Sequence, residues 1–296
     1  MCGIIGIVGK ADAAPLLLDG LKRLEYRGYD SAGIATLVDG VIDRRRAEGK
    51  IKNLNALIDT QPLPGTIGIG HTRWATHGLP TETNAHPHAD ERVVLVHNGI
   101  IENFQELRQE LSEAGRVFHS ETDTEAVVHL ISSYLEDGKS PAEAVAAALK
   151  RLEGAFALAI LFAGHDGLMI AARRGSPLAI GYGEGEMYIG SDALALAPLT
   201  QQICYLEEGD WAEISSAGAV IHDETDAVIE RTVQQTSTSG AMIGKGNFPH
   251  FMLKEIYEQP AVIGDTLQTI LNPWNEVITL PEMPFDLTKI PRITIV

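Results

Sequence analysis

The chain begins with a short apolar run directly behind a cysteine, Met1-Cys2-Gly3-Ile4-Ile5-Gly6-Ile7-Val8. An uninterrupted apolar run of this length is typical of a strand that is buried on both faces. We therefore expect the start of the chain to be held rigidly inside the fold. Because residue two is small, we also expect Met1 to be removed, which would leave Cys2 with both a thiol and a free α-amine.

A cysteine at the chain start can carry out nucleophilic chemistry by itself. The α-amine has an ordinary pKa of roughly 7.7–8.0, so part of it is neutral near pH 7 and can accept the thiol proton. Gly3 has no Cβ that would keep a substrate away from the backbone. Most cysteines near an N-terminus are incidental, so the prediction depends on what the rest of the chain supplies.

Composition and charge exclude several classes of protein. The 296 residues are 45% apolar and 21% charged, which is the balance of an ordinary globular protein with a sizeable core. No apolar run is long enough to cross a membrane, and no basic leader precedes an apolar segment. A net charge of −17 argues against a nucleic-acid surface.

The two cysteines, Cys2 and Cys204, fit a reducing compartment such as the cytoplasm better than a disulfide framework. A bridge between them is the alternative, and the apolar surroundings of Cys204 favour a place in the core. No Cys/His cluster has the spacing of a zinc site, and no glycine-rich phosphate loop occurs. We therefore expect no metal and no cofactor.

The order of periodic segments predicts an α+β fold. Strands on both sides of a central helical block indicate two mostly antiparallel sheets with helices on their faces. Two capping boxes, Thr122-x-x-Glu125 and Ser140-x-x-Glu143, mark helix starts. A polar segment from Arg73 to Glu91 reads as a long functional loop. The segments expected before residue 234 are helices over 12–27, 50–58, 104–114, 122–135 and 140–152, a short helix around Leu194, and strands over 4–8, 34–38, 41–46, 66–71, 92–96, 155–162, 168–172, 178–181, 187–189, 203–206, 210–214, 219–222 and 228–233.

The composition changes near residue 234. Residues 234–250 are rich in Ser, Thr and Gly and are expected to form a linker after a first domain over 2–233. Beyond the linker, one short helix is expected to end at Pro260, another to run over 262–271, and a strand to begin at 293–296. Residues 251–296 therefore read as the incomplete start of a second domain.

Three segments, which contain Arg73, Asn98 and Asp123, could supply partners for Cys2. Arg73 presents a planar fork that matches a carboxylate, although a surface ion pair is an equal alternative. Trp74 and His77 either form a lid or pack. Asn98-Gly99 offers a side-chain amide beside a glycine N–H, the donors of an oxyanion hole, although this dipeptide is also typical of a turn.

Asp123 and a group of three histidines each allow two interpretations. Asp123 at a helix start is either a cap or a ligand for an ammonium group. If it binds ammonium, Arg73 and Asp123 together could hold the two charged ends of an α-amino acid. His86, His88 and His97 have no carboxylate at metal-ligand spacing, so hydrogen-bonded or solvent-facing histidines are favoured over a metal site.

Six segments in order resemble the N-terminal-nucleophile glutamine amidotransferases, and the resemblance extends over essentially the whole chain. It is closest to the branch that transfers ammonia to fructose 6-phosphate to make glucosamine 6-phosphate, in amino-sugar biosynthesis. The segments are Cys2-Gly3-Ile4, Leu24 to Gly33, His71 to Gly78, Asn84 to His88, His97 to Asn103 and Ser120 to Glu125; residues 251–260 also resemble the entry into that branch's sugar-isomerase half.

The resemblance implies a four-layer αββα sandwich and a role for each matching residue. Cys2 would attack the side-chain amide of glutamine and form a γ-glutamyl thioester, with its own amine as the base. Asn98 and Gly99 would hold the oxyanion, and Arg27 would orient the nucleophile. The substrate contacts would come from Arg73, Trp74, Thr76, His77, Gly99 and Asp123, with Arg73 on the carboxylate of glutamine and Asp123 on its ammonium.

The resemblance also implies that residues 2–233 form the glutaminase domain and that 251–296 begin the sugar-isomerase half. Fructose 6-phosphate would be bound only by that half, most of which lies beyond Val296, and a homodimer of the full enzyme stays open. Two alternatives remain. One is an amidotransferase that supplies ammonia to purine biosynthesis, and the other is a non-catalytic glutamine-binding or assembly module, which requires that Met1 be retained.

Overall fold

The computed structural model describes residues 2–75, 78–236, 248–272, 277–278 and 292. It contains two compact units, residues 1–244 and 245–296. The second unit has one long helix, α7 (Phe251–Ile270), and a two-stranded ladder of β16 (Leu271–Asn272) and β17 (Val277–Ile278). The expected strand at 293–296 and most of the expected linker lie outside the described residues.

The first unit is built on two sheets, and every strand pair in them is antiparallel. The first sheet has eight strands in the order β15-β11-β9-β10-β1-β4-β2-β3, with the strand that follows Cys2 near its centre. Its strands are β1 (Gly3–Val8), β2 (Ser31–Val38), β3 (Val41–Glu48), β4 (Ile67–Arg73), β9 (Ala179–Tyr182), β10 (Met187–Gly190), β11 (Gln202–Tyr205) and β15 (Gln234–Gln235).

The second sheet has seven strands in the order β14-β13-β12-β8-β7-β6-β5. Its strands are β5 (His88–Ala89), β6 (Val93–Ile101), β7 (Gly154–Phe162), β8 (Met169–Arg174), β12 (Trp211–Ser215), β13 (Gly218–His222) and β14 (Val228–Ile229).

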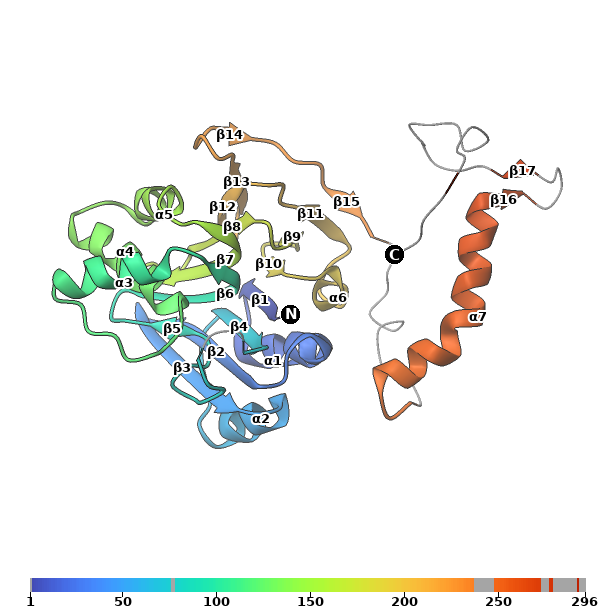
Figure 1. Cartoon of the computed structure of the whole chain (residues 1–296), viewed down its shortest axis with the longest axis horizontal. Helices are drawn as coiled ribbons and strands as arrows, with labels where there is room; N and C mark the ends of the chain where they lie inside the picture. Colours follow the sequence, from blue (N-terminus) through green and yellow to red (C-terminus); the bar gives the residue numbers. More distant parts are fainter. Residues whose placement is uncertain (1, 76–77, 237–247, 273–276, 279–291, 293–296) are drawn as a thin grey trace. The chain divides into compact units, whose positions relative to one another are not determined.

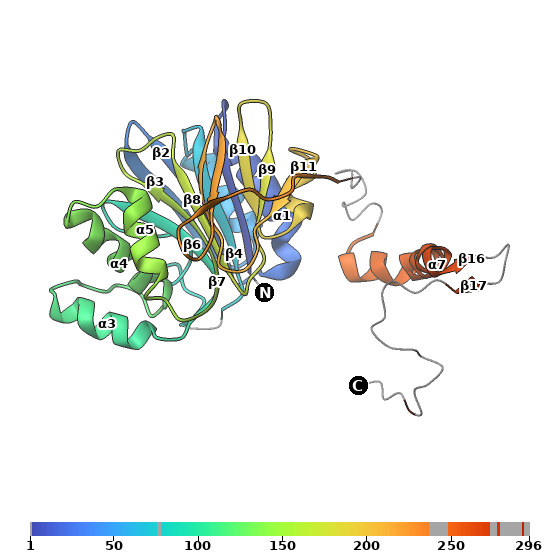
Figure 2. The same ribbon diagram turned by 90° about the horizontal axis from the view of Figure 1, so that it is seen from above.

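Helices cover the outer face of each sheet, which completes four layers (Figures 1 and 2). One apolar cluster packs the first group of helices on the first sheet, and another packs the second group on the second sheet. The expected αββα sandwich is therefore confirmed. The first group is α1 (Ala13–Leu24), the 3-10 helix η1 (Glu25–Arg27), α2 (Ile51–Thr60) and α6 (Ala193–Leu196); the second is α3 (Phe104–Glu113), α4 (Thr124–Glu136) and α5 (Pro141–Leu149).

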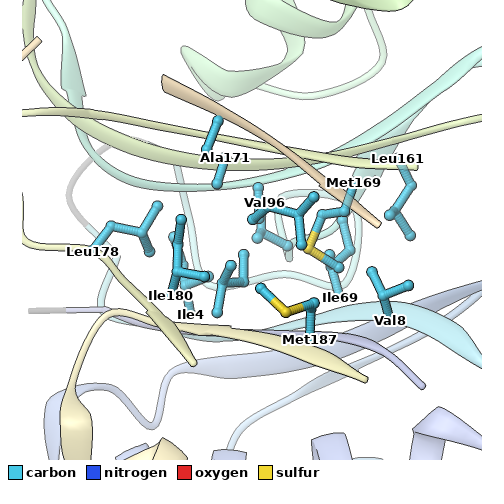
Figure 3. Close-up of a cluster of buried hydrophobic side chains, with 14 of the residues drawn as sticks. Ile4, Val8, Ile69, Val96, Leu161, Met169, Ala171, Leu178, Ile180 and Met187 are labelled. Carbon is cyan, nitrogen blue, oxygen red and sulfur yellow. The ribbon is translucent and has the colours of Figure 1, made fainter. Parts of the chain in front are cut away.

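A third apolar cluster fills the space between the two sheets, and Figure 3 shows its side chains from both sheets meeting there. Because side chains alternate along a strand, each central strand supplies two clusters. In β1, Ile4 and Val8 enter the cluster between the sheets, whereas Ile5 and Ile7 face the helices. This double burial explains why the N-terminal run is apolar throughout.

Glycines in β4 let helix α1 lie close against the first sheet. A Cβ on Gly68 would stand 2.8 Å from the Ala35 carbonyl oxygen and 2.8 Å from Leu17 Cδ1, and a Cβ on Gly70 would stand 3.1 Å from Leu21 Cδ1. The Ile67-Gly68-Ile69-Gly70 pattern thus places large side chains between the sheets and no side chain beneath α1.

One of the two expected capping boxes is absent. Thr122-x-x-Glu125 is not a capping box: α4 begins at Thr124, and the Glu125 carboxylate instead accepts hydrogen bonds from the backbone N–H groups of His119 and Ser120. The Ser140 capping box is confirmed.

The C-terminal expectations also need correction. Pro260 does not end a helix, since α7 runs through it; the proline removes one backbone donor, and the residues on both sides continue the helix. The first two residues of the expected linker, Gln234 and Gln235, form β15 and pair with Ile203 and Gln202. The expected strand over 228–233 is confined to Val228–Ile229.

We expect Gly68→Ala to lower the free energy of unfolding by about 1–3 kcal/mol, because the added methyl group meets backbone and the α1 side chains. Chemical denaturation would measure the change. Gly167→Ala is the matched control, since a Cβ there meets nothing within 4 Å and stability should change little. Equal stability of the two variants would contradict close packing of α1 on β4.

Candidate active site

Cys2 lies immediately before β1, at one end of the central strands of the first sheet. Pairing of Gly3 with Thr72 brings it beside the end of β4. There the Cys2 Sγ accepts a hydrogen bond from the Trp74 backbone N–H at 3.2 Å. Burial raises the pKa of the Cys2 thiol above its ordinary value, against the smaller lowering effect of the Trp74 hydrogen bond. The thiol therefore needs a base before it can attack.

Asn98 reaches Cys2 from the second sheet. It follows Val94 and Val96 on the inward face of β6, and its Nδ2 donates to the Cys2 carbonyl oxygen at 3.1 Å. Its Oδ1 lies 3.1 Å from His71 Nε2. The structure thus brings together the expected nucleophile and the expected oxyanion amide, which are 96 residues apart in the chain.

The Asn98-Gly99 dipeptide is not a turn and does not end a strand. Strand β6 continues to Ile101, and Gly99 pairs with Phe156 within an unbroken register. Gly99 has a φ of +120°, and a Cβ there would stand 2.0 Å from the Ala155 carbonyl oxygen. Only glycine fits this position, because its backbone conformation and the neighbouring strand both exclude a side chain.

Arg73 is the last residue of β4 and is only 3% exposed, so the surface ion-pair interpretation is wrong. Its guanidinium donates to the carbonyl oxygens of Leu79 at 3.2 Å and Gly78 at 3.3 Å. Burial lowers the pKa of Arg73, whereas the charges of Cys2 and Asp123 raise it. Arg73 directly precedes Trp74, whose N–H donates to Cys2 Sγ, so Arg73 lies at the same end of β4 as the thiol.

Asp123 is 6% exposed and occupies the N-cap position of α4, but its carboxylate does not cap that helix. Its Oδ2 instead accepts a hydrogen bond from the Ile101 backbone N–H at 2.9 Å, at the end of β6. The charge of Asp123 also raises the pKa of Cys2. Asp123 is thus held at the end of β6, the strand that also carries Asn98.

The segment before β2 supports the backbone that carries Arg73 and Trp74. The Asp30 N–H donates to the Arg73 carbonyl oxygen at 3.0 Å, and the Asp30 carboxylate accepts from the Ala75 N–H at 2.9 Å. A Cβ on Gly28 would stand 2.7 Å from the Arg73 carbonyl carbon. Sequence reasoning did not assign Gly28 or Asp30 a role.

Trp74 is 44% exposed and contacts Tyr29 edge to face, with ring centroids 5.6 Å apart. Its indole therefore lies at the surface beside the nucleophile, and whether it covers a bound substrate stays a prediction. Thr76 and His77, which were also expected to line the site, lie outside the described residues.

Arg27 pairs with Asp192, which the sequence analysis did not single out. The Arg27 guanidinium donates to the Asp192 carboxylate and, at 3.0 Å, to the Tyr26 hydroxyl, which itself donates to Asp192 at 2.7 Å. The preceding Ser191 accepts from the Ile4 backbone N–H at 2.9 Å. Arg27 thus joins a group anchored next to β1, and in the described contacts it does not touch Cys2 directly.

Four buried histidines lie around the site, and three of them are hydrogen-bonded to two threonines. Thr124 Oγ1 lies 2.8 Å from His86 Nε2 and 3.1 Å from His97 Nδ1, and Thr122 Oγ1 lies 3.1 Å from His88 Nε2. Burial lowers the pKa of His71 to about 3 and those of His86 and His88 well below the ordinary value. Within the described residues, no group of three or more His, Cys, Asp or Glu side chains is arranged to hold a metal ion.

Comparison with known proteins indicates which class of protein this chain resembles. Residues 71–198 match the glutamine amidotransferase domain family. The fold is similar to the Bacillus subtilis glutamine phosphoribosylpyrophosphate amidotransferase, with a TM-score of 0.66 and 26% identity over 77% of this chain and 50% of that one. It is also similar to a regulatory enzyme of purine biosynthesis, with a TM-score of 0.65 and 28% identity over 75% of this chain and 49% of that one. Residues 71–198 and the fold of the first unit are therefore similar to those of glutamine amidotransferases.

More specific relatives are similar along all of this chain. It is 58% identical over 296 residues to the glutamine–fructose-6-phosphate aminotransferase (isomerizing) of Zymomonas mobilis, and 56% identical to that of Gluconobacter oxydans. The chain spans 49% of the length of each of these relatives. The resemblance found in the sequence is therefore confirmed, and this chain corresponds to the amidotransferase half of such enzymes.

We expect alkylation of Cys2 by iodoacetamide to accelerate about tenfold per pH unit between pH 7 and 8.5. The raised pKa keeps the thiol protonated at neutral pH, and only the thiolate reacts. Mass spectrometry of the Cys2 peptide would measure the rate. Cys204, free and buried in the core, is the internal control and should stay unmodified in the folded protein. A rate that is already constant below pH 7 would contradict a raised pKa.

Proposed function

We propose that this chain hydrolyses glutamine to glutamate and ammonia through a γ-glutamyl thioester on Cys2. The observation that carries the proposal is the 3.1 Å hydrogen bond from Asn98 Nδ2 to the Cys2 carbonyl oxygen. The buried Arg73 lies at the end of β4 beside Trp74, and the buried Asp123 lies at the end of β6. A nucleophile, an oxyanion donor and two opposite charges for an α-amino acid are the groups that this reaction requires.

The reaction begins at the chain start. Once Met1 is removed, the neutral α-amine of Cys2 takes the thiol proton, and Sγ bonds to the amide carbon of the glutamine side chain. The oxyanion that forms accepts hydrogen bonds from Asn98 Nδ2 and the Gly99 N–H. The carbon–nitrogen bond then breaks and the proton leaves with ammonia. Water attacks the thioester, releases glutamate and restores the thiol.

Substrate binding follows from the buried charges. The Arg73 guanidinium, which donates to two backbone carbonyls, would turn its fork to the glutamine carboxylate, a stronger acceptor. Asp123 would bind the ammonium group. Trp74, Thr76, His77 and Gly99 would line the pocket, and Arg27, fixed by Asp192, would orient the chain start near Cys2.

For the complete enzyme we propose transfer of the ammonia to fructose 6-phosphate, giving glucosamine 6-phosphate. The support is the 55–58% identity to aminotransferases of that name over this chain. Residues 2–235, which include β15, would form the glutaminase domain, the rest of the expected linker up to residue 250 would follow, and 251–296 would start the sugar-isomerase half. A homodimer of the full enzyme stays open. Two unbridged cysteines support a cytoplasmic location. In the described ranges, no helix combines the length and apolarity that a membrane crossing demands.

We expect Cys2→Ala to reduce glutamine hydrolysis by more than about 10³-fold, since the bond-forming atom is lost. Glutamate release from the purified chain would be measured. Cys204→Ala is the matched control and should stay within about twofold of wild type, because Cys204 lies in the core away from the site. Intact-mass analysis should show loss of Met1 in active material. Full activity of Cys2→Ala, or of material that retains Met1, would overturn the proposal.

We expect the product of the complete reading frame to form glucosamine 6-phosphate from glutamine and fructose 6-phosphate. Chromatography of the sugar phosphates with ¹⁵N-amide glutamine would trace the transferred nitrogen. The matched assay replaces fructose 6-phosphate with phosphoribosyl pyrophosphate, the acceptor of the purine alternative. Labelled nitrogen in phosphoribosylamine, with none in the amino sugar, would replace our assignment with that alternative.

A further inference from the structure

We propose that His71 is a positioning residue that fixes the orientation of the Asn98 side-chain amide and so aims its N–H group at the oxyanion. The inference rests on the proposed glutamine hydrolysis and adds to it a residue outside the set of groups that would touch the substrate.

The hydrogen-bond partners determine which way the amide faces. The Cys2 carbonyl oxygen can only accept, so the Asn98 atom 3.1 Å from it must be the nitrogen. Asn98 Oδ1 therefore faces His71 Nε2, at 3.1 Å. Because an amide oxygen can only accept, Nε2 must carry the hydrogen of the His71 ring.

A second contact supports the same tautomer. His71 Nε2 also lies 3.0 Å from the His97 backbone carbonyl oxygen, another atom that only accepts. One N–H therefore serves two oxygens on consecutive residues of β6. A ring that is fully buried and has a pKa of about 3 stays neutral at working pH, so this donor does not change with protonation.

Burying the polar ring of His71 costs free energy that an apolar side chain at the same position would not cost. His71 follows Ile67 and Ile69 on the face of β4 that packs between the sheets, where an apolar residue would fill the space without a polar atom. In the described structure, His71 Nδ1 has no hydrogen-bond partner and the ring lies against His86, with centroids 4.2 Å apart. The polar benefit of the imidazole thus comes from Nε2 alone, which faces Asn98 and the His97 carbonyl.

Without this donor only the Cys2 carbonyl oxygen would hold the Asn98 amide in this orientation, and that acceptor does not fix Oδ1. A half-turn of the amide would point Oδ1 at the developing oxyanion, which would repel it. Complete loss of one oxyanion donor costs roughly 10²–10³ in rate, and loss of its orientation should cost part of that. The binding of glutamine through Arg73 and Asp123 does not involve this amide and should be unaffected.

The first test compares two substitutions at His71 by steady-state glutaminase kinetics. His71→Leu should lower kcat about 10- to 100-fold and leave KM for glutamine within about twofold. His71→Gln carries a terminal amide N–H near the place of Nε2 and should recover most of kcat. His88→Leu and His88→Gln are matched controls, since His88 is buried in the same cluster but contacts Thr122 instead of Asn98. Both His88 variants should keep kcat near wild type.

The second test is a double-mutant cycle with Asn98→Ala. If His71 acts through Asn98, adding His71→Leu to Asn98→Ala should lower kcat no further, beyond about twofold. A full additional loss in that background would overturn the inference. A rise in KM instead of a fall in kcat, or equal losses for the His71 and His88 substitutions, would also overturn it and assign His71 a purely structural role.

Folding and function are separated by further measurements. If circular dichroism shows that His71→Leu does not fold, His71→Asn replaces it, because its shorter amide ends near Nδ1 and cannot reach Asn98. Low kcat in His71→Asn with recovery in His71→Gln supports the inference, and equal kcat in the two overturns it. A wild-type chain with no glutaminase activity would overturn the proposed function instead, whereas an active wild type matched by His71→Leu would overturn only the role of His71.

Discussion

The packing of the two sheets against each other is the interaction on which the rest of the structure depends. Strands β1 and β4 from one sheet and β6 and β7 from the other interleave alternate side chains in one apolar layer. That layer holds the start of β1 opposite the far end of β6, and so it determines the distance between Cys2 and Asn98. Because both strands are also covered by helices on their outer faces, neither can shift without disturbing two apolar clusters.

The site is a polar continuation of this apolar layer. Along β6 the inward positions run Val94, Val96, Asn98, and along β4 they run Ile67, Ile69, His71, so the same alternation that builds the core delivers polar groups at its edge. Rigid strands hold these groups, which suits a site whose donors must be in place before charge develops. The long polar segment between β4 and β6 then supplies carbonyl partners for Arg73.

Apolar periodicity was sufficient to predict two mostly antiparallel sheets with helices on their faces, because it is a local signal. The roles of Cys2, Arg73, Asn98 and Asp123 came from the resemblance and stay predictions. The sequence did not reveal that β6 continues past residue 96, because the polar Asn98 and the glycine after it interrupt the apolar pattern. The strand was expected to end before Asn98, and it runs to Ile101. Thr122 and Glu125 had the spacing of a helix start, but Thr122 contacts His88 and Glu125 accepts from the N–H of Ser120 instead. The contacts of Asp30 with Ala75 and of Asp192 with Arg27 join segments far apart in the chain, so no local pattern predicts them.

The buried imidazoles tie the fold itself to acidity. Burial lowers the pKa values of His71, His86 and His88 in the folded chain, whereas an unfolded chain would protonate them near 6.5. Their contribution to stability is therefore complete above about pH 6.5 and declines as the medium becomes more acidic, because only the unfolded state takes up protons there. The buried rings near Asn98 thus also lower the free energy of unfolding in acid.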